Sequence, residues 1–372
     1  MSGTLDRAEA YLDLGRYQQA AALASQHLAQ QPDDASALLV LARCQRHLED
    51  LPAGLASVDQ ALRITPDAPF AWMLRADTLS RMGRHHEAVA AAQRCVEYGP
   101  LFWWSHHTLA LVLERSGNGA LRRDGYAAAL RATELGPQEA SAHFMLGLIA
   151  HRLGDHRTAR AAYGTTLRLD PQSSEAHNNL AMLDQRRSWS SRRAWSRAAE
   201  GFVTSASLDV EDTHARFNLE GMAWGVAASA RWCAFAGMAV ALVSTQGGRS
   251  GGQDGGGPAG PLVGALLLVL MWGAWFLWQR SRMTPRVRRT MALVARGCPP
   301  VLVMAAAVAL PALHSLVTVV SAVALPAVDT GVLAACAGLL FWNLILTYWI
   351  SRVFLGRRAP GRRARRGAGG PG

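Results

Sequence analysis

The chain has 372 residues, half of them hydrophobic, and a formal net charge of +11. All 38 of its basic residues are arginines, because the sequence contains no lysine. A chain without lysine has no phosphate-binding P-loop, no Schiff-base lysine and no Ser–Lys dyad, so several classes of enzyme are excluded.

The charge is distributed unevenly along the chain. Residues 221–372 hold 15 arginines and two acidic residues, whereas residues 1–220 hold 23 arginines and 25 acidic residues. The excess positive charge therefore belongs to the second half, and it does not indicate a folded basic patch for nucleic acid. The same change in composition predicts two domains, 1–220 and 221–355, followed by a tail, 356–372.

The stretch 140–171 predicts two short amphipathic helices. Apolar and small residues recur at helical spacing on both sides of Gly154, and Pro171 ends the second run. One such helix pair cannot bury its own apolar face, so further copies must stack against it.

Further copies are present with a period of 34 residues. The prolines that end each pair are spaced by 34, 34, 37 and 34 residues: Pro32, Pro66, Pro100, Pro137 and Pro171. The hinge positions between the helices of each pair follow the same period: Gly15, Glu49, Gly83, Gly117, Gly154 and Ser188. The longer step in both series places a three-residue insertion between Gly117 and Pro137.

Small residues recur where the two helices of a pair must touch. They are Ala8, Ala42, Ala76, Ala110, Gly147 and Ala181 in the first helices and Ala20, Gly54, Ala88 and Ala159 in the second helices. A 34-residue period with this pattern resembles the tetratricopeptide repeat. The resemblance implies an all-α fold with a solenoid of six repeats and a partial seventh over residues 1–220. In such a fold the first helices line the concave face, on which a protein or peptide can bind.

The sixth repeat departs from the pattern. Its second helix is predicted to resume near Ala198–Ser207, about five residues late, as judged from the apolar spacing. A further first helix is predicted from Thr213, and it leads directly into the first of four apolar runs.

The four apolar runs are predicted to be transmembrane helices because each approaches the length that crosses a bilayer. They cover about 223–244, 261–279, 300–325 and 331–354, with a Gly-rich loop at 245–260 and an Arg-rich loop at 280–298. Basic loops stay in the cytoplasm, so we expect a multi-pass protein of the cell (plasma or inner) membrane with the solenoid and both termini inside. Trp224, Trp278 and Trp349 are then expected near the inner interface.

A peptide-binding groove is predicted from the positions that the resemblance places on the concave face. A basic residue stands two positions before the hinge in each of repeats two to six. We call these residues the basic rail: His47, Arg81, Arg115, Arg152 and Arg186. The complete predicted groove adds a mostly apolar row and flanking residues: Arg43, Arg46, Met73, His107, Phe144, His151 and Asn178. Such a groove suits an extended or helical peptide with acidic residues. The alternative is that the arginines are solvated or pair with local acids such as Asp77 and Glu114.

No catalytic set, metal site or cofactor is predicted. Adjacent histidines such as His85 and His86 point about 100° apart on a helix and do not easily share one ion. The five cysteines show no paired spacing and are expected to be buried free thiols.

A rival hypothesis is a small transporter or membrane enzyme that the repeat domain regulates. It rests on the polar residues of the apolar runs, which are Arg231, His314, Ser315 and Asn343. Adjacent Ser and His on a helix do not face each other, and so few polar groups make a poor pathway, so we favour an anchor. The disordered Arg-rich tail is predicted to bind anionic lipid headgroups, and no element is predicted to bind a specific nucleic acid.

Overall fold

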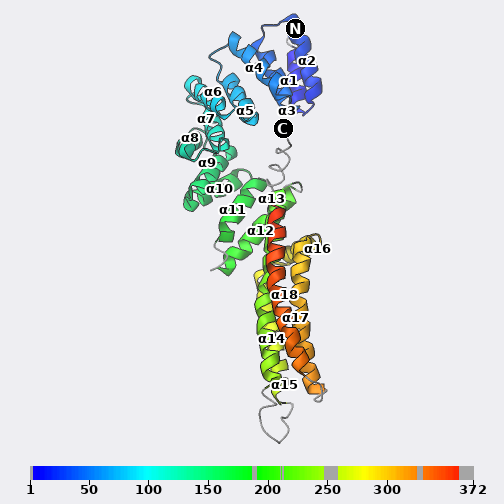
Figure 1. The fold of residues 1–372 in the computed structure, drawn as a ribbon. Helices are drawn as coiled ribbons and strands as arrows, with labels where there is room; N and C mark the ends of the chain where they lie inside the picture. The colour runs from blue at the N-terminus through cyan, green and yellow to red at the C-terminus, as the bar shows by residue number, and fades with distance from the viewer. Residues whose placement is uncertain are drawn as a thin grey trace, which may run out of the picture. The chain divides into compact units, whose positions relative to one another are not determined.

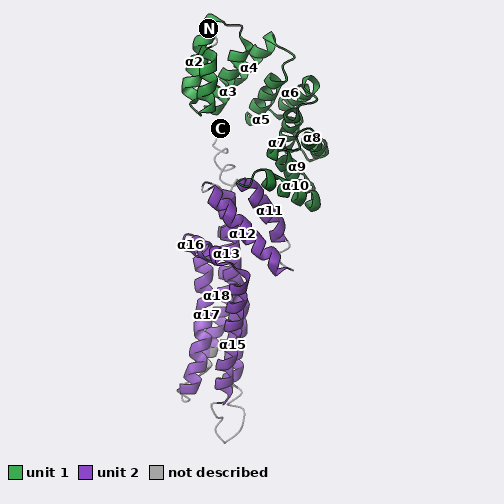
Figure 2. Ribbon diagram, turned by 180° about the vertical axis from the view of Figure 1, so that it is seen from behind, with its two compact units in different colours: residues 1–172 green, residues 173–372 purple. Residues whose placement is uncertain are grey.

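The computed structural model describes residues 3–186, 191–209, 211, 213–246, 259–324 and 330–359, which form helices and no strand. The predicted all-α class is therefore confirmed. Figure 1 shows the helices in chain order, and Figure 2 shows the two compact units into which the chain divides, residues 1–172 and 173–372.

The first unit consists of five helix pairs. Its helices are α1 (Gly3–Asp13), α2 (Tyr17–Gln30), α3 (Ala35–His47), α4 (Leu51–Ile64), α5 (Pro69–Arg81), α6 (His85–Tyr98), α7 (Trp103–Arg115), the short 3-10 helix η1 (Gly119–Leu121), α8 (Arg122–Leu135), α9 (Ala140–Leu153) and α10 (His156–Leu169). The three-residue insertion falls at η1, as the spacing predicts. First helices of consecutive repeats, α1, α3, α5, α7 and α9, also contact one another. They form a continuous surface that we call the first-helix face.

The hinge positions have the backbone conformation that ends a helix. Gly15, Gly83, Gly117 and Gly154 have φ between 68° and 84°, and Glu49 has φ 61°. Glycine adopts this left-handed region without steric cost, whereas an ordinary residue such as Glu49 loses about 1–2 kcal/mol there. The sixth predicted hinge, Ser188, lies outside the described residues.

The small residues predicted at the helix contacts are buried. Ala8, Ala76, Ala88 and Ala110 are fully inaccessible to solvent. Their lack of bulk lets paired helices approach closely, which is how short amphipathic helices with modest apolar content form a packed core.

The second unit contains the sixth helix pair and the apolar helices. Its elements are α11 (Ser174–Arg186), α12 (Arg192–Leu208), α13 (Thr213–Ser229), α14 (Arg231–Gln246), α15 (Ala259–Arg282), α16 (Pro285–Arg296), α17 (Pro299–Ala324) and α18 (Thr330–Arg357). Four segments are long and apolar enough to cross a membrane: Thr213–Thr245, Ala259–Arg282, Pro299–Ala324 and Ala335–Arg357. Each overlaps one of the four runs predicted from the sequence, although the first begins ten residues earlier than predicted. The apolar helices α14, α15, α17 and α18 pack lengthwise (Figure 1).

Several details of the second unit differ from the prediction. Helix α12 begins at Arg192, earlier than the Ala198 that apolar spacing indicated, because the Ser191 hydroxyl caps it by accepting from Ala194 N at 3.3 Å. The predicted junction between α13 and α14 is interrupted by a turn at Ala230, so the two helices are consecutive and not continuous. The flanks of the predicted loop 245–260 and tail 356–372 are helical, since α14 reaches Gln246 and α18 reaches Arg357.

The Arg-rich segment predicted as a loop contains helix α16. Thr284 caps it by accepting from Val287 N at 3.4 Å, and Pro285 occupies its first turn. Val287 and Met291 are buried in a cluster with Trp195, Phe202 and Leu219 of α12 and α13. The sequence predicts a loop here because the segment is rich in arginine. The cap at Thr284, followed by Val287 and Met291 four residues apart, is a signal that could have predicted the helix.

Candidate functional site

The basic-rail arginines of the first unit each pair with a carboxylate of the preceding repeat. The pairs are Arg81 with Glu49 at 3.3 Å, Arg115 with Asp77 at 2.9 Å, and Arg152 with Glu114. The last two acids are those that the alternative interpretation of the arginines named. The rail thus links consecutive first helices along the first-helix face.

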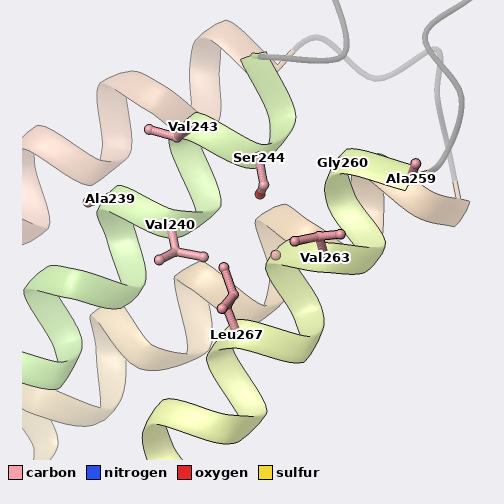
Figure 3. Close-up of a pocket in the computed structure, with 9 residues that line it drawn as sticks. Ala239, Val240, Val243, Ser244, Ala259, Gly260, Val263 and Leu267 are labelled. Carbon is pink, nitrogen blue, oxygen red and sulfur yellow. The ribbon is translucent and has the colours of Figure 1, made fainter.

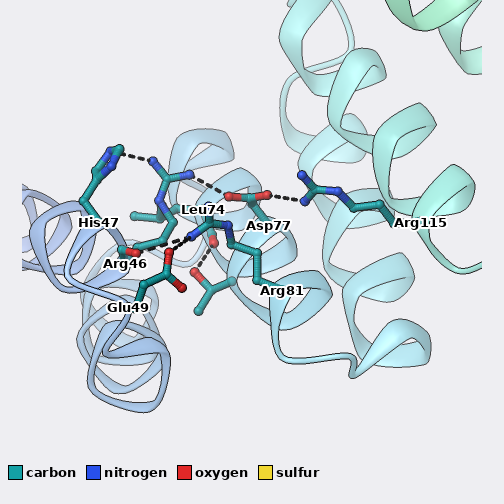
Figure 4. A network of polar contacts seen from close by, with 8 residues as sticks. Arg46, His47, Glu49, Leu74, Asp77, Arg81 and Arg115 are labelled. Carbon is teal, nitrogen blue, oxygen red and sulfur yellow. Dashed lines mark hydrogen bonds and ion pairs between the residues drawn. The ribbon is translucent and has the colours of Figure 1, made fainter. Parts of the chain in front are cut away.

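Asp77 forms ion pairs with two arginines from different helices. Its carboxylate accepts from Arg46 at 2.6 Å and from Arg115 at 2.9 Å, so one acid on α5 serves arginines on α3 and α7 (Figure 4). The Asp77 side chain is 16% exposed, whereas that of Arg115 is 40% exposed. An ion pair with one sheltered partner is less screened by solvent than a fully exposed one.

The first-helix face keeps an excess of positive charge around Asp77. Arg81 bonds Glu49 and also donates to the Arg46 carbonyl at 3.4 Å. Arg43 is half-buried and forms no ion pair with any described residue. Three guanidinium groups therefore share two carboxylates in this region, and the fourth, that of Arg43, adds positive charge without a carboxylate.

Two of the three histidines of the predicted groove, His47 and His107, have a lowered pKa. Burial lowers the pKa of His107 to about 4, and the charge of Arg115 acts in the same direction. Burial, followed by the charges of Arg46, Arg81 and Arg43, lowers the pKa of His47. The His47 ring stacks on Tyr17 with 4.3 Å between centroids. At neutral pH these rings offer apolar faces and single hydrogen bonds, not charge.

The predicted apolar row takes part mainly in packing within the repeats. Phe144 and His151 both lie against the buried ring of Tyr163, with centroids 5.8 and 6.4 Å apart. His107 meets Trp103 edge to face at 5.8 Å. Met73 is half-buried on α5. The side chains of this row therefore form a packed aromatic floor, that is, the surface between the arginines, and do not line a set of open pockets.

The last two predicted groove residues belong to the second unit. Asn178 is buried, and its Oδ1 accepts from Asn218 Nδ2 at 2.9 Å, which joins α11 to α13. Arg186 is exposed at the end of α11. The structure thus places ten of the twelve predicted groove residues in the first unit, on α3, α5, α7 and α9.

The four polar residues of the apolar helices are not joined to one another by hydrogen bonds within the described ranges. The Arg231 guanidinium lies 4.4 Å from the Tyr348 ring and donates to Ala228 O at 2.7 Å. The Ser315 hydroxyl donates to Pro311 O at 2.7 Å. His314 is half-buried and Asn343 is exposed. Arg231 and Ser315 are therefore accommodated by local contacts, and no hydrogen bond joins the four residues into one site within the described ranges.

Several hollows lie among the described helices of the second unit, and two of them are relevant to function. An apolar one of about 600 Å³ lies between α14 and α15, where Val240, Val263 and Leu267 point into it (Figure 3). The other, of about 640 Å³, is lined by Arg192, Trp195 and Arg282 among others. Sequence reasoning missed this polar cavity, because its residues come from helices far apart in the chain. No three His, Cys, Asp or Glu side chains gather like metal ligands in the described part of the protein.

Comparison with known proteins identifies the repeats. Models of the tetratricopeptide repeat match residues 5–69, 71–100, 109–163 and 152–183. The N-terminal part of the chain is therefore a tetratricopeptide-repeat solenoid, followed by four candidate membrane-spanning helices. A search of curated proteins gave no match.

Solved structures with similar folds share little sequence with this chain. The Cut9–Hcn1 hetero-tetramer of the APC/C is 14% identical, with a TM-score of 0.51, and the match covers 57% of this chain and 41% of that one. PilF of Pseudomonas aeruginosa is 14% identical, with a TM-score of 0.49, over 57% of this chain and 94% of that one. YrrB, described as having an unusual peptide-binding site, is 17% identical, with a TM-score of 0.39, over 52% and 95%. At such identities the likeness concerns the fold alone.

Proposed function

We propose that this protein is a membrane-anchored, non-enzymatic scaffold that binds a cytoplasmic protein or peptide on its first-helix face and recruits it to the membrane. The observation that carries the proposal is the combination, in one chain, of a tetratricopeptide-repeat solenoid with four apolar membrane-length helices. Stacked repeats present an extended surface for partners, and the apolar helices hold that surface at a bilayer.

The charge of the first-helix face supports an acidic ligand. Arg46 and Arg115 share the single carboxylate of Asp77, and Arg43 has no carboxylate among the described residues. Guanidinium groups present several donors in a planar fork, so a ligand carboxylate can bind beside Asp77 without breaking the existing pairs. Neutral His107 and the aromatic floor suit the apolar side chains of the same ligand.

The proposed orientation of the chain rests on the distribution of its arginines. The Arg-rich ends of α15 and α18 lie with α16 at the end of the bundle where α12 and α13 pack. Trp278 and Trp349 are exposed close to these ends, and Arg282 and Arg352 lie over their rings. Basic segments and interfacial tryptophans are typical of the cytoplasmic boundary of a membrane protein, so the proposal puts the solenoid inside the cell.

The experiment that tests the proposal is a crosslinked capture of partners from membranes. The wild-type chain is compared with a double variant, Arg43→Glu and Arg115→Gln, and with a matched control, Arg63→Glu, an exposed arginine of the second helix α4. We expect a cytoplasmic partner that the wild type and the control capture and the double variant does not. Hydrogen exchange in α3–α7 is measured for each variant to check that it stays folded. An unchanged set of captured proteins in the double variant would overturn the groove.

A further inference from the structure

A polar cavity of about 640 Å³ lies in the second unit, where α12 begins, α15 ends and α13 passes between them. Two arginines line it, Arg192 of α12 and Arg282 of α15, together with Trp195, Trp278 and Gln279. None of the described residues that line the cavity is acidic. The cavity therefore gathers cations without a carboxylate to neutralise them.

Arg282 is fixed in the cavity by two aromatic rings. Its guanidinium carbon lies 4.6 Å from the centroid of Trp195 and 4.3 Å from that of Trp278. The side chain is half-buried, its Nε is buried without a hydrogen-bond partner, and it forms no ion pair in the described part of the chain. A desolvated cation is costly unless an anion or an acceptor compensates it, and the aromatic faces supply only part of this compensation.

Arg192, which is exposed to solvent, adds a second positive charge to the lining of the same cavity. Its Nη2 donates to Ser281 O at 2.5 Å, and its remaining donors have no partner among the described residues. The N-terminus of α12, where Ser191 also lines the cavity, contributes the positive end of a 17-residue helix. Two guanidinium groups and a helix N-terminus together make a site for an anion such as phosphate.

Gln279 provides a place for a hydroxyl group beside the arginines. It is 6% exposed, and its Nε2 donates to Ser229 Oγ at 3.0 Å, while its Oε1 is buried without a partner. A buried carbonyl oxygen that lacks a donor costs free energy that a ligand hydroxyl would recover.

The position of the cavity along α15 indicates where its ligand comes from. Arg282 is the last residue of a candidate membrane span, and Trp278 lies one turn earlier. Earlier in the same helix, Val269 and Leu270 are more than half exposed, as residues in contact with lipid chains are. Met222 and Val226 form an apolar wall of the cavity. A basic, partly apolar cavity at the end of a span fits a phospholipid headgroup.

We propose that this cavity binds the phosphate of an anionic phospholipid between Arg192 and Arg282, with a headgroup hydroxyl at Gln279. Phosphatidylglycerol has both groups. Because the site joins α12 to α15, bound lipid would hold the sixth repeat against the membrane helices.

Lipid retention measured by native mass spectrometry on the full-length protein tests the proposal. In every variant the tail arginines Arg362, Arg363, Arg365 and Arg366 are replaced by glutamine, so that the tail does not contribute. The variants are Arg192→Gln and Arg282→Gln, and the matched control is Arg289→Gln, which removes the same charge from the exposed surface of α16. Each protein is offered phosphatidylglycerol and phosphatidylcholine.

We expect the parent protein and Arg289→Gln to retain phosphatidylglycerol in preference to phosphatidylcholine. Each cavity variant should weaken that preference about tenfold, because each loses charge-assisted bonds to phosphate. Equal retention in Arg192→Gln, a substitution of an exposed side chain, would overturn the proposal. An equal loss of preference in Arg289→Gln would also overturn it, because the lipid would then be held by unspecific charge attraction. Displacement of the lipid by equimolar inorganic phosphate would overturn it as well, because the cavity would then be a site for the free ion.

Discussion

The guanidinium of Arg115 on α7 donates to the carboxylate of Asp77 on α5 at 2.9 Å, and this contact joins two consecutive repeats. In the sequence Arg115 belongs to a row of basic residues that predicts a binding surface. In the structure the same row holds the repeats together through acids that it shares. The two roles are compatible because the arginines outnumber the carboxylates.

Removing the shared acid should loosen the junction between repeats. Asp77→Asn leaves Arg46 and Arg115 facing each other without a counter-charge, and we expect the local opening free energy of α5–α7 to fall by about 2 kcal/mol. Hydrogen exchange of the full-length protein measures it. The control is Glu87→Gln, which breaks an exposed pair with Arg84 at the start of α6 and should change exchange little. Similar effects of the two substitutions would contradict a structural role for Asp77.

Gly147 is required by the ring that packs on it. A Cβ at this position would lie 2.7 Å from the buried ring of Tyr163, so Gly147→Ala must displace that ring. We expect the free energy of unfolding of the fifth repeat to fall by about 1–3 kcal/mol. Hydrogen exchange in α9 and α10 measures this loss. Gly164→Ala on α10 is the control, because a Cβ there meets nothing within 4 Å, and its higher helix propensity should stabilise the same repeat. Stabilisation by both substitutions would show that Tyr163 yields freely.

Acidification should weaken the fourth repeat through His107. Burial lowers the pKa of His107 from 6.5 to about 4, so between these values the unfolded chain binds a proton that the folded chain does not. Stability contributed by neutral His107 is therefore complete above pH 6.5 and is lost as the pH falls towards 4, by about 3 kcal/mol for the whole shift. The measurement is the opening free energy of α7 against pH in the wild type and in His107→Leu. Parallel curves would mean that His107 does not titrate in this window.

Helix α16 should depend on its buried methionine. Met291 is 6% exposed in the cluster with Trp195 and Phe202, so Met291→Ala should cost about 2–5 kcal/mol locally and detach α16 from α12. Faster hydrogen exchange confined to α16 and α12 is the expected result. Leu293→Ala, at a side chain 67% exposed, is the control and should leave exchange unchanged. Equal protection in both variants would mean that the cluster does not hold the helix.

Much of the fold could be predicted because it depends on local pattern. The hinge at Gly83 was predicted from spacing alone, and it has the positive φ that ends a helix. The four membrane-length helices were predicted because length and apolar composition are sufficient to identify them. The start of α12 and the existence of α16 were missed, because a cap at Ser191 and buried contacts at Val287 outweigh the apolar periodicity of those stretches.

The candidate site could be predicted only in part. The sequence predicts twelve groove residues on the first helices of one solenoid, since a repeat converts sequence register into position on a face, and ten of them lie on α3, α5, α7 and α9 of the first unit. It could not decide which acid each arginine meets. The side chain of Arg152 reaches Glu114, 38 positions away in the sequence, and that choice depends on how the helices stack.

The sequence by itself determined the repeat, its register and the apolar spans, because each is a pattern within a few turns of helix. Only the tertiary structure decided that Asp77 serves two arginines and that Arg192 and Arg282 meet in one cavity without an acid. The physical reason is that charge compensation is settled between side chains from different helices, and its outcome depends on distances of a few ångströms that no local pattern encodes.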